Sequence, residues 1–281
     1  MPEGDTVWNT ARVLERALTG EVLTGSDLRL PRLATTDLTG WTVAASASRG
    51  KHLLLRLTRA GHDPLTLHSH LRMEGAWRSY APGERWSGRP AHLIRVVLRT
   101  ARSVAVGYHL HDVALLRTAE EDRLVGHLGP DLLGDDWDPA EAARRIAASP
   151  AATIAEALLD QRNLAGVGNL YKAETLFLRG LWPWTPVAEV ADLTGTVELA
   201  QRLVAANRGR WTQTTTGSLR RGETSYVYGR RAQPCRRCGT AVRKAERSPL
   251  PLSGKAEMED RITFWCPRCQ PEPATVRDGG E

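Results

Sequence analysis

The sequence contains no run of apolar residues long enough to span a lipid bilayer. A signal peptide is also missing, because the polar stretch PEGDT stands where a positive charge and an apolar segment would be needed. No segment repeats. These absences predict a cytosolic protein without membrane contact. With 281 residues the chain is long enough to bury a substantial core, and its length favours two domains over one.

Cysteine is scarce, and all four cysteines stand in two pairs, Cys235-Arg-Arg-Cys238 and Cys266-Pro-Arg-Cys269, with 27 residues between the pairs. Two such pairs can supply four thiolates to one zinc ion, and in a cytosolic chain this interpretation is favoured over a redox pair or two local disulfides. Four protein ligands leave no position for a substrate, so the predicted zinc is structural.

The positive charge is concentrated in one segment. Residues 220–247 hold nine Lys or Arg against Glu223 and Glu246, which gives +7, whereas the whole chain carries +6. The rest of the chain therefore sums to 6 − 7 = −1. Such a cluster can bind a polyanion or can be a solvated surface, and charge alone does not distinguish the two.

The first half of the chain has the pattern of an antiparallel β-structure. Apolar residues at helical spacing predict a helix over 6–18 that stops at Gly20. From 22 to 118, short apolar runs alternate with Gly, Pro and Ser, and no long helical pattern separates them. We therefore predict an antiparallel sandwich or barrel over 1–118 and a linker over 119–137.

The second half has a helical pattern. Asp138 and Pro139 begin one helix, and Thr153 with Glu156 forms a capping box for a second that runs to about Arg162. The glycine turn AGVGN leads into a helix capped by Asn169 and stopped by Gly180, and helical stretches around 197–207 and up to Trp211 follow. We predict a helical domain over 138–232, a zinc finger over 233–271 and a disordered tail over 272–281.

Proline directly behind the initiator methionine is the most unusual local feature. Removal of Met1 would leave Pro2 with a terminal secondary amine that is less basic than a lysine, and such an amine attacks a carbonyl carbon to form an iminium whose charge cannot be lost. Glu3 beside it can move protons. The alternative is a frayed chain end.

Three further residues are candidates for binding phosphate. Asn169 stands where backbone N–H groups at a helix start can bind an anion, Lys51 stands at the start of a strand in SRGKHLLLRL, and Arg261 begins RITFW, the predicted strand before the second cysteine pair. Taken singly, each is also explained as a cap or as a surface charge.

These pieces occur together in one order. PEG, RGKHL, HLRMEG, LGPDLL, AGVGNLYKAE, VYGR, CRRC and RITFWCPRC resemble the formamidopyrimidine-DNA glycosylase and endonuclease VIII family from residue 2 to about 270. The resemblance implies an α+β protein with an N-terminal β-sandwich, a helix-two-turn-helix domain and a C-terminal zinc finger. It implies a monomer that binds damaged DNA in the cytoplasm, at the nucleoid, as a DNA glycosylase and AP lyase of base excision repair.

By the same resemblance, Pro2 is the nucleophile at the sugar C1′ and Glu3 is its acid/base partner. Lys51, Asn169 and Arg261 hold phosphates around the flipped nucleotide, with Lys51 and Arg261 also counted among the catalytic residues. Met73 fills the gap left by the flipped base, and Leu115 or Leu116 stands where relatives place other wedge residues. His68 and His70 are expected to be ordinary sheet or turn residues.

The chain departs from the formamidopyrimidine branch in several places. It begins PEG rather than PEL, lacks the Arg and Phe wedge in HLHDVALLRT, and has a short stretch from Thr214 to Tyr228. These features favour oxidised pyrimidines. An 8-oxoguanine or formamidopyrimidine glycosylase is the first alternative, and a noncatalytic zinc-containing nucleic-acid-binding protein is the second. Thr6 replaces a glutamate of many relatives, and the zinc spacing is longer than usual.

Overall fold

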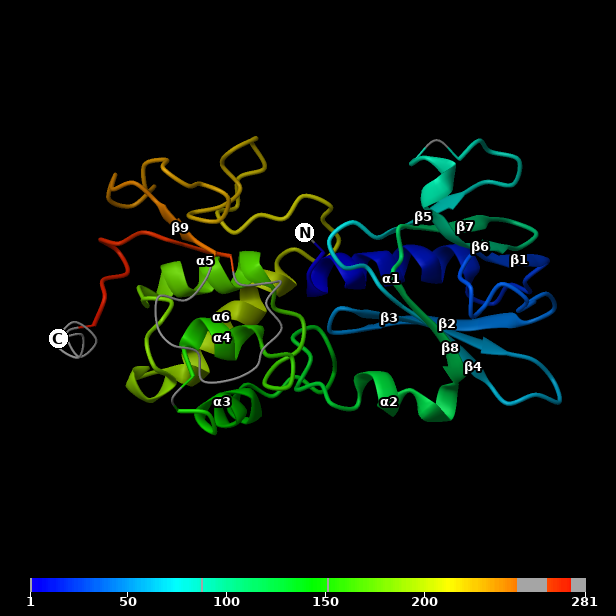
Figure 1. Ribbon diagram of the computed structural model, residues 1–281, viewed down its shortest axis with the longest axis horizontal. Coiled ribbons are helices and arrows are strands. Elements are labelled where there is room, and N and C mark those ends of the chain that lie inside the picture. Colours follow the sequence, from blue (N-terminus) through cyan, green and yellow to red (C-terminus); the bar gives the residue numbers. More distant parts are fainter. Residues whose placement is uncertain (1, 87, 151, 247–261, 274–281) are drawn as a thin grey trace. The chain divides into compact units, whose positions relative to one another are not determined.

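The computed structural model describes residues 2–86, 88–150, 152–246 and 262–273 (Figure 1). The chain divides into two compact units, Met1–His127 (unit 1) and Leu128–Glu281 (unit 2). The division falls within 119–137, a stretch that also contains the short helix α2 (Asp122–Val125). Arg261 and most of the predicted tail over 272–281 lie outside the described residues. None of the described helices is long and apolar enough to cross a membrane.

Unit 1 is an antiparallel β-sandwich with one long helix, α1 (Gly4–Leu18), so the predicted fold class is confirmed. One sheet has the strand order β1-β6-β7-β5 and the other has the order β2-β3-β4-β8. The strands are β1 (Gly25–Leu28), β2 (Thr42–Arg49), β3 (His52–Thr58), β4 (Leu65–His70), β5 (Ala76–Tyr80), β6 (Ile94–Arg99), β7 (Val104–Tyr108) and β8 (Asp112–Arg117). Short 3-10 turns lie at Ala91–Leu93 and Thr118–Glu120.

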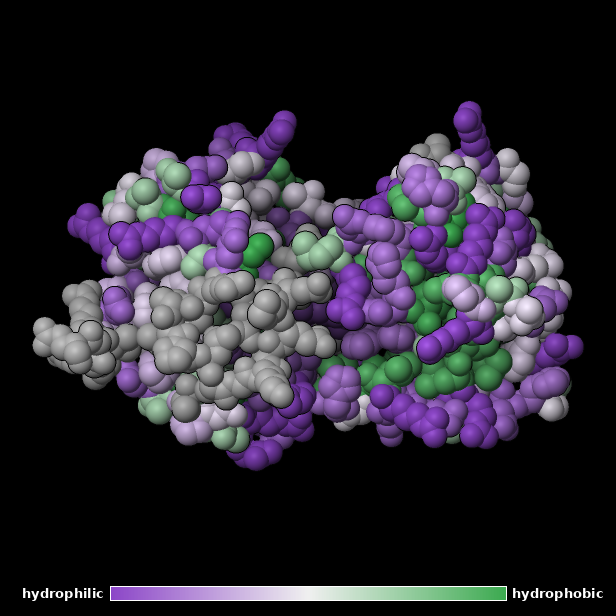
Figure 2. Space-filling view, viewed as in Figure 1, coloured by the Kyte–Doolittle hydropathy of each residue, from purple (hydrophilic) through white to green (hydrophobic). Residues whose placement is uncertain are grey.

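Helix α1 is held against the sheets by the apolar face that the sequence predicts. Val7, Ala11, Leu14 and Leu18 are all buried and belong to a core cluster that includes residues of both sheets. Burial of such side chains from water is the main force that fixes a helix of this length. The helix begins at Gly4, two residues earlier than predicted, so its first turn follows directly after Glu3. Hydrophilic residues cover most of the face seen in Figure 2, and apolar ones gather over the sheets of unit 1.

Unit 2 begins as a group of helices: α3 (Pro139–Ala147), α4 (Ile154–Leu159), α5 (Asn169–Arg179) and α6 (Leu193–Ala205), with a 3-10 turn at Val187–Glu189. Asp138 caps α3, with Pro139 in the first turn, and the Thr153–Glu156 capping box is present at α4. Gly180 ends α5 with a φ of 70°. These four local signals place the helix ends as predicted.

Three expectations for unit 2 are wrong. Helix α4 ends at Leu159 rather than near Arg162, because Asp160 is extended and the Gln161 amide binds the carbonyls of Leu159 and Val167 across the following turn. Residues 206–211 form turns rather than a helix. Gly168, not Asn169, is the N-cap of α5, and Asn169 is its first residue.

The last described part of unit 2 is a small hairpin. Strand β9 (Arg243–Ala245) pairs antiparallel with β10 (Thr263–Trp265), in line with the strand predicted at RITFW. Phe264 of β10 packs in one cluster with Ala173 and Phe177 of α5, Val227, and the buried Cys235 and Cys266. The cysteine pairs therefore rest on the helix that begins at Asn169.

Candidate functional site

The N-terminal end of unit 1 places Pro2 and Glu3 in a fixed position. Pro2 is half-buried and Glu3 is 0 % exposed, and the Glu3 carbonyl accepts a hydrogen bond from the Val7 N–H at 3.1 Å. Glu3 is the residue at the start of α1, where the positive end of the helix dipole favours a carboxylate. A buried carboxylate thus stands directly after Pro2 in the chain. Asp5, which the sequence analysis did not single out, is also 0 % exposed.

Lys51 lies at the tip of the turn that joins β2 to β3. The last residue pair of the two strands is Arg49 with His52, so Gly50 and Lys51 form the connection, and Gly50 has a φ of 55° that favours glycine. The Lys51 side chain is half-buried. The turn explains why a glycine precedes the lysine in RGKHL, and it fixes the lysine at the end of a rigid hairpin.

Four histidines gather beside Lys51. His52 Nδ1 and His68 Nε2 are 2.8 Å apart, and the His52 ring centroid lies 5.2 Å from that of His70 and 6.4 Å from that of His127. His68 and His70 do lie on strand β4, as expected, but the cluster was not foreseen.

Burial determines the charge of this histidine cluster. It lowers the pKa of His52 to about 3, with the neighbouring histidines and Arg72 adding to the effect. Burial and the positive charges of Arg72 and Lys51 lower the pKa of His70 to about 4, and burial also lowers the pKa of His68. Depressed values keep these rings neutral at pH 7, so they add no positive charge beside Lys51.

The side chains of Met73, Leu115 and Leu116 differ in how far they are exposed to solvent. Met73 lies in the turn after β4 and is 62 % exposed, so its side chain is not part of the core. Leu115 and Leu116 lie on β8, opposite Leu67 and Thr66 of β4. Leu115 is partly buried and packs against the core cluster of unit 1, whereas Leu116 is also partly buried but does not belong to that cluster.

In unit 2, Asn169 is held by a buried lysine. Lys172 is 1 % exposed, and its Nζ donates to Asn169 Oδ1 at 2.8 Å, to the Ile262 carbonyl at 3.1 Å and to Thr263 Oγ1 at 3.0 Å. The bond to Oδ1 leaves the donor end of the Asn169 amide for another acceptor. Ile262 directly follows Arg261 in the sequence, and one ammonium group links the start of α5 to Ile262 and to Thr263 of β10.

Glu174 of α5 holds the segment between α6 and the first cysteine pair by hydrogen bonds, as Lys172 holds Asn169. Its carboxylate is 0 % exposed and accepts hydrogen bonds from the N–H groups of Tyr226, Val227 and Tyr228 at 2.7 to 2.8 Å, as well as from the Thr215 hydroxyl. Bonds to an ionised acceptor are stronger than neutral ones. The glutamate of AGVGNLYKAE therefore fixes the YVY segment at 226–228 on α5.

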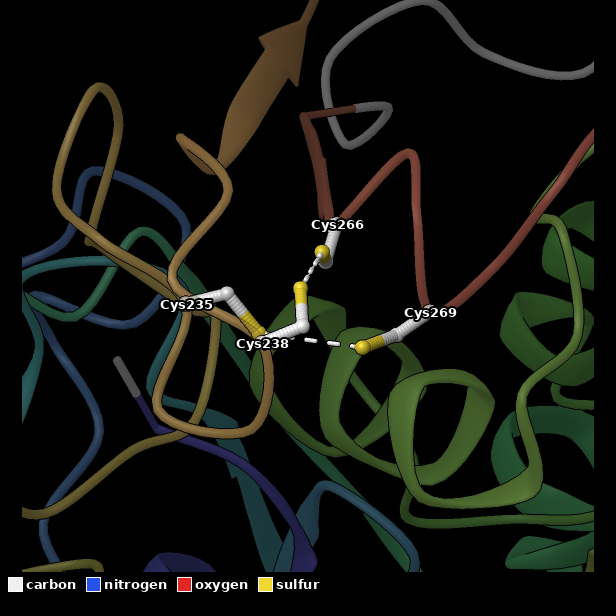
Figure 3. A group of neighbouring side chains, drawn as sticks. All are labelled: Cys235, Cys238, Cys266 and Cys269. Atoms are coloured by element: carbon white, nitrogen blue, oxygen red, sulfur yellow. Dashed lines mark hydrogen bonds between the residues drawn. The ribbon is translucent and has the colours of Figure 1, made fainter.

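The four cysteines converge, as the spacing predicts. Figure 3 shows their side chains pointing into one small space, and all four Sγ atoms lie within 4.8 Å of one another. Cys235 and Cys269 have Sγ atoms 3.9 Å apart, and those of Cys238 and Cys266 are 3.4 Å apart. Four sulfurs at about 2.3 Å from one tetrahedral zinc would be about 3.8 Å apart. The cluster therefore fits a zinc-sized metal.

The chemistry of the donor set agrees with its geometry. Hydrogen bonds from Thr240 lower the pKa of Cys238 to about 6, so this group is largely thiolate at neutral pH. The thiolate is the form that binds a metal. Cys235 and Cys266 are buried, and burial raises the pKa of Cys266.

The predicted residues fall into two sets. Pro2, Glu3, Lys51 and Met73 belong to unit 1, whereas Asn169 and the four cysteines belong to unit 2. Three fixed groups that sequence reasoning missed are the histidine cluster, Lys172 and Glu174. The spacing from Asn169 to Lys172 is a signal that could have been used, since residues three apart on a helix are neighbours.

Comparison with known proteins gives a consistent result over nearly the whole chain. Residues 1–113 match the formamidopyrimidine-DNA glycosylase N-terminal domain, and residues 128–204 match the formamidopyrimidine-DNA glycosylase H2TH domain.

Among individual proteins, a probable endonuclease 8 2 of Streptomyces coelicolor is 56 % identical over 100 % of this chain and 97 % of that protein. The DNA-(apurinic or apyrimidinic site) lyase Nei2 of Mycolicibacterium smegmatis is 45 % identical over 96 % of this chain and 99 % of that protein. A Lactococcus lactis Fpg in complex with DNA containing an abasic site has a similar fold, with a TM-score of 0.75 at 23 % identity over 96 % of this chain and 100 % of that one.

Proposed function

Since the chain belongs to the formamidopyrimidine-DNA glycosylase and endonuclease VIII family, we propose that it removes oxidised bases, chiefly pyrimidines, from DNA through a Pro2 iminium. It is a DNA glycosylase and AP lyase of base excision repair. The observation that carries the proposal is the position of Pro2, directly after the initiator methionine, beside a fully buried carboxylate at the start of α1.

The proposed chemistry begins at the sugar. After removal of Met1, the Pro2 nitrogen forms a bond to C1′ and gives up its proton, while the glycosidic bond breaks and the base leaves with the bonding pair and takes up a proton. Glu3 protonates the ring oxygen as the sugar opens, which gives an iminium between Pro2 and C1′. The iminium acidifies the C2′ hydrogens, and loss of one of them as a proton forms a C2′–C3′ double bond and expels the 3′ phosphate. A second elimination releases the 5′ phosphate, and water then hydrolyses the iminium to free the enzyme.

Lys51, Asn169 and Arg261 are proposed to hold the phosphates around the flipped nucleotide. Two features of the structure support this. Lys51 is presented by a tight hairpin turn, and the Asn169 amide is oriented by the Lys172 ammonium so that its N–H groups are available to a phosphate oxygen. Met73, exposed in the turn after β4, is proposed to fill the gap in the base stack.

A preference for pyrimidines is supported by the compact course of residues 214–228. The Thr214 hydroxyl donates to the Ser218 carbonyl at 2.8 Å, and the Thr215 N–H donates to the Thr224 carbonyl at 2.8 Å. A loop folded on itself in this way has little length left to cover a large oxidised purine.

Product analysis on a set of duplexes, each with one defined lesion, tests this preference. We expect faster base release from 5,6-dihydrouracil and thymine glycol than from 8-oxoguanine. An abasic duplex serves as the control, because its cleavage requires no base recognition. Faster release of 8-oxoguanine than of both pyrimidines would contradict the proposal.

The domain limits at 1–118, 138–232 and 233–271 are part of the same proposal, as are a monomeric state and action on the nucleoid in the cytoplasm.

Zinc is the proposed metal of the last domain, held by Cys235, Cys238, Cys266 and Cys269 as four thiolates. When bound, zinc would hold the two cysteine pairs together and supply no chemistry to the reaction.

We expect the purified protein to carry about one zinc per chain and to bind damaged DNA more weakly once a chelator has removed the metal. Because the cysteines pack on α5 in unit 2, the β-sandwich of unit 1 is expected to stay folded. Metal analysis and circular dichroism measure the two effects. A stable protein with two disulfides and no metal would refute the assignment.

A further inference from the structure

A short loop after α6 is closed by one buried side chain. Asn207 is 0 % exposed, and its amide Nδ2 donates to the carbonyls of Leu203 and Thr214, both at 2.9 Å. The Thr214 N–H donates back to Asn207 Oδ1, also at 2.9 Å. The Asn207 side-chain amide thus exchanges two hydrogen bonds with the Thr214 backbone, as paired residues of neighbouring strands do. Both ends of the loop are buried and fixed, and Gly209 makes the bend with a φ of 76°.

The tip of this loop presents a large aromatic side chain to solvent. Trp211 is 69 % exposed, the highest value among the large exposed hydrophobic residues of the described chain. In the part of the chain that the structure describes, no ring contact or hydrogen bond of the indole is found. A tryptophan side chain that lies on a fixed loop and does not pack in the core indicates a binding surface.

The charges around Trp211 indicate the chemical class of the ligand that this surface binds. Residues 207–222 contain four arginines (Arg208, Arg210, Arg220 and Arg221) and no acidic residue, for a charge of +4. All four arginines are exposed, as is Leu219 at 62 %. The two halves of the segment share one anchor, because Thr214 closes the first loop and its hydroxyl binds the Ser218 carbonyl at 2.8 Å.

We propose that this segment is a base-stacking site in which the Trp211 indole lies on an unpaired nucleobase and the flanking arginines contact the phosphates on either side. Aromatic rings set in a positive surface bind single-stranded nucleic acid in this way, without reading its sequence. The proposal rests on the proposed function in that DNA is the substrate. It adds a contact to an unpaired base through residues outside the proposed catalytic set.

Binding to a single-stranded, fluorescein-labelled oligothymidine of about 16 nucleotides tests the site. Trp211→Ala is expected to weaken this binding about 5- to 140-fold, the range for loss of one stacked base, whereas Trp211→Phe keeps a ring and most of the affinity. An undamaged duplex of equal length has no unpaired base and should bind both variants like the parent. Fluorescence anisotropy gives the affinities.

The salt dependence separates stacking from charge. Trp211→Ala should leave the slope of log affinity against log salt unchanged, and Arg210→Ala should reduce it by about 0.7, the value for one phosphate of a single strand. Equal binding of Trp211→Ala and parent to the single strand would overturn the proposal. An equal loss on the duplex would also overturn it, since no unpaired base is present there.

Failure of the proposed function would look different. Borohydride trapping of the parent on an abasic duplex reports the chemistry and does not depend on the single-strand binding assay. A parent that binds single strands through Trp211 but never traps would retain the stacking site and refute the lyase mechanism. If the parent is trapped on DNA but Trp211→Ala does not weaken binding to the single strand, the stacking site is refuted. The loop would then bind some other partner.

Discussion

Blocking the Pro2 nitrogen is expected to abolish both borohydride trapping and strand cleavage. The mechanism requires a covalent iminium between that nitrogen and the deoxyribose, and an N-terminal extension converts the amine into an amide that cannot form one. Borohydride reduces an iminium to a stable amine. Incubation of the parent with DNA containing dihydrouracil should therefore link the DNA to the N-terminal peptide, as detected by mass spectrometry after digestion.

Two variants give this experiment its controls. The same extension placed at the C-terminus should leave trapping intact, which excludes a general effect of added length. Pro2→Gly keeps a terminal amine, though a primary one, and should retain part of the trapping. Efficient trapping by the N-terminally extended protein would mean that a lysine elsewhere is the nucleophile.

Replacement of Glu3 by glutamine should slow base excision by about 10² to 10⁴-fold, the usual contribution of a positioned acid/base group. Binding to damaged DNA should change little, because the amide has the size of the carboxylate and Glu3 is buried at 0 % exposure. Single-turnover excision rates measure the loss. Cleavage of an abasic site should suffer less, since no base then has to leave.

Asp5→Asn is the matched control for Glu3→Gln. Asp5 is equally buried, at 0 % exposure, and lies in the same first turn of α1. Any loss caused by removing a buried negative charge near the helix start should appear in both variants, and the loss specific to acid/base chemistry should appear only in Glu3→Gln. If both variants slowed excision equally, Glu3 would have no special role.

Sequence reasoning located those parts of the fold that depend on neighbouring residues. The cap at Asp138, the Thr153–Glu156 box and the stop at Gly180 all act within one turn, so their residue types alone indicate the structure. The end of α4 depends instead on Gln161, whose amide binds across to Val167 and whose carbonyl oxygen accepts from the Gly166 N–H. A contact between turns of this kind leaves no local pattern.

The candidate site likewise has some residues that the sequence alone identifies and others whose role appears only in the structure. The cysteine pairs could be assigned from spacing, because four thiolates have few other uses in such a chain. Lys172 resembles any helical lysine in the sequence, and its importance appears only when β10 lies beside α5. Asn169 was expected to cap its helix, but a lysine one turn later occupies its side-chain oxygen instead.

The Glu174 carboxylate has a consequence for how unit 2 moves. It binds three consecutive amides that lie 52 to 54 residues further along the chain, in a stretch without helix or strand. Amide protons in such a stretch normally exchange rapidly with deuterium. Here they can exchange only when α5 releases its glutamate, so this irregular segment and the helix should open together as one cooperative element.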